Sequence, residues 1–162
     1  MKKVKIFSLI VVAQIGQYLI TLEEINGTKL IPVWIGPAEG MAITAVINND
    51  KFPRPLTHDL MATIINNLNA KLESVIITDL KDDTFYADMK LAVGKETISI
   101  DCRPSDSIAL ALRCNAPIYV EDRVFKKCPD IHKPITGKEV EDFKKTLENL
   151  TPEDFFKGKR EK

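Results

Sequence analysis

Apolar and polar positions alternate over several short segments of this chain, and elsewhere apolar residues recur at helical spacing. Alternation, or a short β-branched apolar run, indicates a strand, whereas a repeat near 3.6 residues indicates a helix. On this pattern the predicted strands are residues 4–13, 17–22, 29–35, 72–80, 84–93, 97–102 and 117–120. The predicted helices are residues 37–48 and 57–69, one capped by Ser105, one after Thr136 and a short one after Thr151.

Turn residues divide these elements into hairpins. Asn26-Gly27 predicts a hairpin turn because both residues tolerate a positive φ, and polar or glycine-containing turns follow at 81–83 and 94–95. The charged segment 121–133 is predicted to be a loop. Hairpins mixed with helices predict an α+β fold, with a mixed, largely antiparallel sheet packed with four to five helices. We expect one domain over residues 1–157 and a charged tail at 158–162.

Composition narrows the class of protein. The 162 residues carry 23 basic and 23 acidic side chains, so no global field attracts nucleic acid, although a local patch could still bind it. Three cysteines without a C-x-x-C spacing fit a reducing cytoplasm. No segment is long and apolar enough to span a membrane. The apolar run 6–13 after two lysines superficially resembles a signal peptide, and a buried strand explains it as well.

Three predicted helices begin with charged residues, and the segment 53–59 holds the densest group. It places Arg54, His58 and Asp59 close together, with prolines fixing the backbone on both sides of the arginine. We expect Thr57 to be the N-cap, so that His58 and Asp59 lie in the first turn. There the unpaired N–H groups and the helix dipole favour anions. The segment therefore predicts a rigid loop suited to phosphate chemistry.

The other two charged helix starts are residues 34–39 and 101–106. If the three starts converge, their side chains would form one cleft in which carboxylates bind a divalent ion, arginines bind phosphate and a histidine moves a proton. The predicted catalytic residues are His58, Asp59 and Asp101, the predicted phosphate-binding residues are Arg54, Thr57, Arg103 and Ser105, and the predicted ligands of Mg²⁺ or Mn²⁺ are Glu39, Asp59 and Asp106. No organic cofactor is expected.

A structural interpretation of the same residues stays open. Acidic residues in a first turn complement the helix dipole without any catalytic role. Asp101 with Arg103, or Arg54 with Asp106, could likewise form ion pairs that only stabilise the fold. The sequence alone does not decide between these interpretations.

Five stretches of the sequence together match one known family. They are LIPVWIG at 30–36 with Glu39, PRPLTHDL at 53–60, TFYA at 84–87, DCRPSDSIALA at 101–111 and LTPEDF at 150–155. On these stretches the chain resembles the bifunctional nuclease domain family, and it is similar to bare-domain bacterial members of hyperthermophile type. Two positions depart from the family's usual residues: Gly40 stands in place of alanine, and Cys102 in place of a small residue such as alanine.

The resemblance implies a nuclease, because plant members of the family are credited with cleaving both DNA and RNA. It implies no settled catalytic residues, so the candidate site depends on the three helix starts. Two alternatives stay open: a non-catalytic phosphate-binding or oligomeric scaffold, and a hydrolase of small phosphoesters. We expect a homodimer, since small soluble proteins commonly form one.

Overall fold

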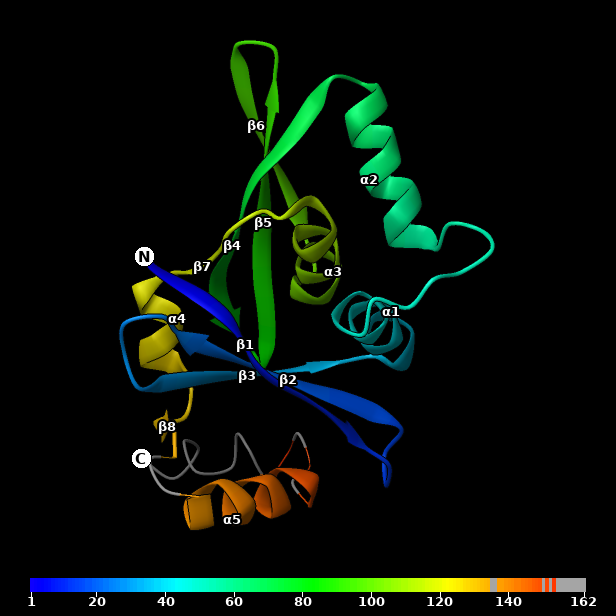
Figure 1. Ribbon diagram of the computed structural model, residues 1–162. Coiled ribbons are helices and arrows are strands. Elements are labelled where there is room, and N and C mark those ends of the chain that lie inside the picture. Colours follow the sequence, from blue (N-terminus) through cyan, green and yellow to red (C-terminus); the bar gives the residue numbers. More distant parts are fainter. Residues whose placement is uncertain (135–136, 150, 152, 154–162) are drawn as a thin grey trace.

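The computed structural model describes residues 1–134, 137–149, 151 and 153, and within them the chain forms one eight-stranded sheet and five helices (Figure 1). The strands are β1 Lys2–Val12, β2 Gln17–Glu24, β3 Lys29–Ile35, β4 Ala70–Lys81, β5 Thr84–Val93, β6 Glu96–Cys102, β7 Ile118–Val120 and β8 Ile131–His132. The helices are α1 Pro37–Ile47, α2 Thr57–Asn67, α3 Pro104–Cys114, α4 Asp122–Lys127 and α5 Gly137–Glu148. The predicted α+β class is confirmed.

The sheet joins two antiparallel units through one parallel contact. Its strand order is β6-β5-β4-β7-β1-β2-β3-β8, and β4 with β7 is the parallel pair. The β4–β5–β6 meander and the β1–β2–β3 unit are therefore held together by the short β7, which follows α3 in the chain. The prediction of a mixed, largely antiparallel sheet is confirmed. The apolar run that resembled a signal peptide lies in the central strand β1 and the residue after it.

Helices cover both faces of the β1–β2–β3 unit. On one face α1 and α3 enclose the main core, to which β2 contributes Ile20 and Leu22. On the other face lies α5, whose Leu147 packs with Leu19 of β2 (Figure 1). Successive residues of β2 thus serve opposite faces, as the two-residue period of a strand requires. No helix in the described part of the chain is long and apolar enough to cross a membrane.

Two turns show how the hairpins are made. The turn between β2 and β3 lies where it was predicted, but the reason was wrong, because neither Asn26 nor Gly27 has a positive φ. Positive φ values occur instead at Asp82 and Asp83, at 47° and 59°, in the two-residue loop between β4 and β5. Two consecutive positive φ values match a type I′ turn, whose twist suits a hairpin.

The segment predicted as a loop at 121–133 contains α4 and β8, so that prediction was wrong. The segment is mostly charged, but it contains an apolar pair, Val124 and Phe125, which is buried against the core. Lys127 of α4 donates to the buried Asp79 of β4, which anchors the helix to the sheet. The helix predicted after Thr136 is present as α5, whereas the short helix predicted after Thr151 and the tail lie largely or wholly outside the described residues.

Candidate functional site

The starts of α1, α2 and α3 lie close together, since α3 packs against both other helices and its first residues contact Glu39 of α1 and His58 of α2. Two of the predicted caps were wrong by one or two residues. Leu56, not Thr57, is the N-cap of α2, and its backbone N–H donates to Oδ2 of Asp59 at 2.8 Å. Arg103, not Ser105, is the N-cap of α3, because Pro104 takes the first helical position that its fixed φ favours.

Three charged side chains and one histidine form a continuous series of contacts across the three helix starts. Nη2 of Arg103 lies 2.7 Å from Oε1 of Glu39, and Nε of the same arginine lies 2.7 Å from Oδ2 of Asp106. Oδ1 of Asp106 lies 3.1 Å from Nε2 of His58. We refer to Glu39, Arg103, Asp106 and His58 as the helix-start cluster. It joins α1, the start of α3 and α2 in that order.

Burial differs along the helix-start cluster. The His58 side chain is 8% exposed and that of Glu39 is 15% exposed, whereas that of Arg103 is 68% exposed. The hydrogen bond and charge of Asp106, with a smaller contribution from Glu39, raise the pKa of Arg103 further above its ordinary value. The cluster therefore presents a permanently charged guanidinium to solvent, with an imidazole buried behind it.

Gly36 lets the Glu39 carboxylate fold back against the start of α1. A Cβ atom at position 36 would lie 2.6 Å from Oε2 of Glu39, closer than real Cβ contacts. Pro37 takes the first position of the helix, as predicted. The glycine thus leaves room for the carboxylate that meets Arg103.

Asp59 is turned away from the helix-start cluster. Besides accepting the N–H of Leu56, its carboxylate pairs with Nε of Arg113, which is 8% exposed. Arg113 also donates to the carbonyl oxygens of Ala42 in α1 and Ala109 in α3. Chiefly through the hydrogen bond from Arg113, the pKa of Asp59 is lowered from its ordinary value. Arg113 therefore ties the three helices together, and Asp59 is its charged partner.

The remaining predicted site residues do not join the helix-start cluster. Thr57 lies at the first position of α2 and lines the same cavity as His58. Ser105 is buried in the first turn of α3 beside a different hollow, and Arg54 is exposed in the loop between α1 and α2. Asp101 is exposed on β6, opposite Asp88 of β5. The structure thus brings together His58, Arg103, Glu39 and Asp106 from the predicted set.

The predicted metal ligands are not gathered around one point. Glu39 and Asp106 both pair with Arg103, whereas Asp59 pairs with Arg113. Among the residues that the structure describes, no three His, Cys, Asp or Glu side chains lie close enough together to hold a metal ion. As arranged here, these residues do not fit a three-ligand Mg²⁺ or Mn²⁺ site.

A cavity of about 540 Å³ opens beside the helix-start cluster and includes all four of its members. Its other walls are largely apolar, and Phe52, from the α1–α2 loop, is 51% exposed. The apolar residues that line it are Tyr18, Ala38, Met41, Ala42, Ala45, Phe52 and Leu56. A volume of this size falls within the usual range for small-molecule sites.

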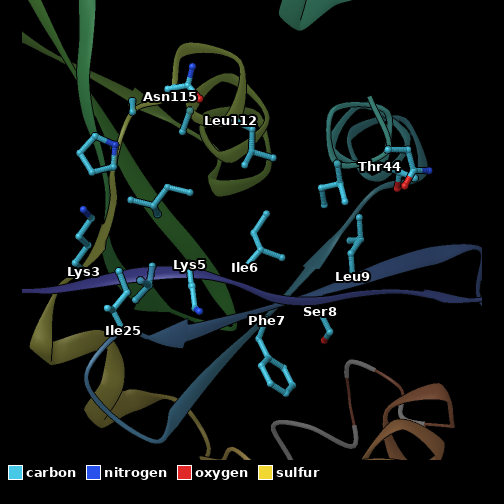
Figure 2. A pocket seen from close by; sticks show the side chains of 17 residues that line it. Lys3, Lys5, Ile6, Phe7, Ser8, Leu9, Ile25, Thr44, Leu112 and Asn115 are labelled. Carbon is cyan, nitrogen blue, oxygen red and sulfur yellow. The ribbon is translucent and has the colours of Figure 1, made fainter. Parts of the chain in front are cut away.

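A larger cavity of about 820 Å³ lies near the C-terminal ends of α1 and α3. Figure 2 shows Ile6 of β1 pointing toward Leu112 of α3 across it. None of the residues lining this cavity is a carboxylate or a histidine. The acid–base groups expected of a phosphate-handling site are thus found at the smaller cavity.

Sequence reasoning missed several residues at the site. Arg113 stands in the last turn of α3, where a basic residue is readily explained as a complement to the dipole. Its contacts with α1 and α2 depend on the packing of the helices. Phe52 and Tyr18 lie outside the charged helix starts, although both line the cavity.

Cys102, noted as unusual, is half-buried, and burial raises the pKa of its thiol to about 11, so it is a poor nucleophile near neutral pH.

The fold and site define an α+β protein in which a carboxylate-bound histidine and an exposed arginine meet at converging helix starts. Comparison with known proteins places the chain in a family. The sequence profile of the Bifunctional nuclease domain matches residues 20–131. An uncharacterised protein of Mycobacterium tuberculosis is 40% identical over 149 residues, which cover 86% of this chain and 89% of the relative.

Several plant relatives are named as bifunctional nucleases. Bifunctional nuclease 1 of Oryza sativa subsp. indica is 31% identical over 111 residues, covering 66% of this chain and 34% of the relative. Bifunctional nuclease 1 of Arabidopsis thaliana is 27% identical over 105 residues, covering 62% and 32% respectively. The matched part thus spans about a third of each plant protein. The chain belongs to the bifunctional nuclease domain family.

Proposed function

We propose that this protein is a nuclease that hydrolyses phosphodiester bonds of DNA or RNA at the helix-start cluster. The observation that carries the proposal is the contact series from Glu39 through Arg103 and Asp106 to His58, which places a cation and an acid–base group beside one cavity. Membership of the bifunctional nuclease domain family and the names of the plant relatives support the substrate class.

His58 is the acid–base group in this proposal. When Nε2–H donates to the Asp106 carboxylate, Nδ1 is the nitrogen that can accept a proton. A water molecule would attack phosphorus while Nδ1 takes its proton, and the P–O bond to the leaving sugar oxygen would break. That oxygen would take a proton from solvent. Removal of a positioned general base typically lowers a rate by about 10²–10⁴-fold.

Arg103 is the phosphate-binding group in this proposal. Its guanidinium is exposed and lies at the start of α3, where unpaired backbone N–H groups also favour an anion. The starts of α1 and α2 lie beside it and add the same preference. A phosphate oxygen would compete with Glu39 for Arg103, because that carboxylate already pairs with the guanidinium.

Dependence on Mg²⁺ or Mn²⁺ stays a prediction. The present arrangement of Glu39, Asp59 and Asp106 does not assemble a metal site, so no step of the proposed reaction passes through a metal ion. Chelation by EDTA tests the prediction directly.

The alternative to a nuclease is a non-catalytic phosphate-binding or oligomeric scaffold, and one observation favours the oligomeric scaffold. The cavity is lined by three carboxylates, from Glu39, Asp50 and Asp106, against the single guanidinium of Arg103. Such an acidic lining opposes the binding of a polyanion. A scaffold would use the cluster to hold the three helices together and would show no turnover.

The decisive experiment compares His58→Ala with His132→Ala, because these are the two histidines of the chain. His132 lies on β8, exposed and outside the cavity that His58 lines. Cleavage of single- and double-stranded DNA and RNA is measured with and without EDTA, alongside the melting temperature. We expect about 10²-fold or greater loss in His58→Ala and none in His132→Ala. Equal cleavage by both variants, or no cleavage by the unmodified protein, would refute the proposal.

A further inference from the structure

The two edges of the sheet differ sharply in how they are protected. β8 ends the sheet on one side and has only two residues, whereas β6 ends it on the other with seven. The register between β5 and β6 has no bulge, and β6 contains neither proline nor lysine. Proteins usually protect a long edge strand with such features, because its unpaired backbone groups can pair with another strand. β6 lacks them.

One face of β6 continues the core surface beyond the cover of the helices. Ile98 is paired with Leu91, and Ile100 with Met89. Leu91 and Met89 are buried in the main core, and cross-strand partners point to the same face of a sheet. Ile98 and Ile100 nevertheless remain 43% and 38% exposed. The core face of the sheet is therefore incompletely covered at this edge.

The hairpin turn determines which backbone groups of β6 point outward. Val93 pairs with Glu96 around a two-residue loop, in which Gly94 has a φ of 63°, as the first position of a type II′ turn requires. Such a loop closes on a hydrogen-bonded pair, and these pairs then alternate along the strands. The N–H and C=O groups of Thr97, Ser99 and Asp101 therefore point away from β5, toward the open edge.

We infer that β6 pairs antiparallel with β6 of a second copy of this chain, about a two-fold axis at Ser99. Ser99 is the central residue of the strand, so this register pairs all seven residues. It places Ile98 opposite Ile100 of the second copy, twice over, on the uncovered core face. On the other face Thr97 lies opposite Asp101 of the second copy, so no two acidic residues lie directly opposite each other. The two sheets join into one.

Charge and area both suit a second copy as the occupant. The net charge is zero, so two copies do not repel each other. A strand pair alone buries less than the roughly 800 Å² per partner of a standard interface. On the same face as Ile98 and Ile100 lies α2, and the stripe formed by its Leu60 and Ile64 with its C-cap Leu68 is 53%, 48% and 68% exposed. This stripe provides apolar surface that can extend the contact.

A cysteine at the proposed axis tests the register. The Cα atoms of a hydrogen-bonded antiparallel pair lie about 5.5 Å apart, within disulfide range. With an oxidant at equimolar or lower concentration, we expect Ser99→Cys to form covalent dimers. Their yield should be at least tenfold that of Thr97→Cys, because a cysteine at position 97 would lie opposite Asp101 of the second copy and not opposite another cysteine. The unmodified protein, with its three free cysteines, gives the background. Equal cross-linking at positions 97 and 99, or none at 99, would overturn the register.

A charge on the apolar face tests the interface itself. Light scattering coupled to size exclusion should give a dimer for the unmodified protein, a monomer for Ile98→Lys, and a dimer for the control Ile47→Lys. Ile47 is an equally exposed isoleucine, 48% exposed, on α1. Both variants should keep the unmodified melting temperature within a few degrees. A dimer that Ile98→Lys leaves intact would overturn the inference. A monomeric unmodified protein would overturn it too, and this is the result expected if β6 pairs with a different protein.

Discussion

Oδ1 of Asp106 lies 3.1 Å from Nε2 of His58, and this contact joins the first turn of α3 to the first turn of α2. The second oxygen of the same carboxylate accepts a hydrogen bond from Nε of Arg103 at 2.7 Å. A single carboxylate thus orients both an imidazole and a guanidinium. Its removal should disturb the two groups that the proposed reaction needs, without touching the substrate itself.

We therefore expect Asp106→Asn to lower kcat by about 10- to 100-fold, less than the loss of the general base itself. The amide has one acceptor oxygen, so it cannot accept from both His58 and Arg103 as the carboxylate does. Initial cleavage rates measure the effect. Asp130→Asn, before β8, removes an exposed acidic residue that does not line either hollow beside Arg103, and it should leave kcat unchanged. Equal losses in both variants would contradict a specific role for Asp106.

The Asp59–Arg113 pair should matter for stability rather than for chemistry. Arg113→Met would remove the guanidinium that donates to the Asp59 carboxylate and to the carbonyl oxygens of Ala42 and Ala109, and would leave Asp59 with the backbone N–H of Leu56. We expect about 2 kcal/mol of destabilisation, below the full cost of breaking a buried ion pair, because Asp59 is 38% exposed and partly screened by water. Urea unfolding measures it. The exposed Arg54→Met should change the free energy of unfolding by less than about 0.5 kcal/mol.

Acid should destabilise the contact between α4 and the sheet. The hydrogen bond from Lys127 lowers the pKa of Asp79 to about 2, whereas an unfolded aspartate titrates near 3.9. A native pKa below the unfolded value stabilises the fold above about pH 4, and this contribution is lost as the pH falls toward 2. Between pH 5 and pH 2 the melting temperature should fall less in Asp79→Asn than in the unmodified protein. An identical fall in both would contradict this assignment.

The strands and the main helices could be predicted from the sequence because their apolar spacing is regular. The three charged helix starts could also be recognised, since proline and acidic residues mark them locally. Segment 121–133 could not, because the apolar pair Val124–Phe125 is too short to show a period among charged residues. It becomes a helix only through contacts with β4, and those contacts are not visible in the local sequence.

The partners of each charged residue were beyond the reach of sequence reasoning. Asp59 and Asp106 both stand in the first turn of a helix, and local sequence gives both the same two possible roles. Helix packing separates them: it places Arg113 beside Asp59 and His58 beside Asp106. Side-chain pairing across 48 or 54 positions of sequence depends on the angle between helices, which no local pattern specifies.

Gly40, where the bifunctional nuclease domain family usually has alanine, is explained by Tyr18. A Cβ atom at position 40 would lie 2.3 Å from Cγ of the Tyr18 ring, so the ring occupies the space that an alanine methyl would need. We expect Gly40→Ala to destabilise the protein by up to about 2 kcal/mol, because an overpacking cost of about 1–3 kcal/mol exceeds the roughly 1 kcal/mol that alanine gains over glycine within a helix. Urea unfolding of the single variant measures this cost.

The double variant Gly40→Ala with Tyr18→Leu separates overpacking from any other effect of the methyl group. Leucine lacks the ring that blocks position 40, so the added methyl should cost little, or even stabilise α1, in the Tyr18→Leu background. The comparison is a double-mutant cycle with both single variants measured under the same conditions. An equal cost of Gly40→Ala in both backgrounds would show that Tyr18 is not what excludes alanine, because the coupling energy would then be zero.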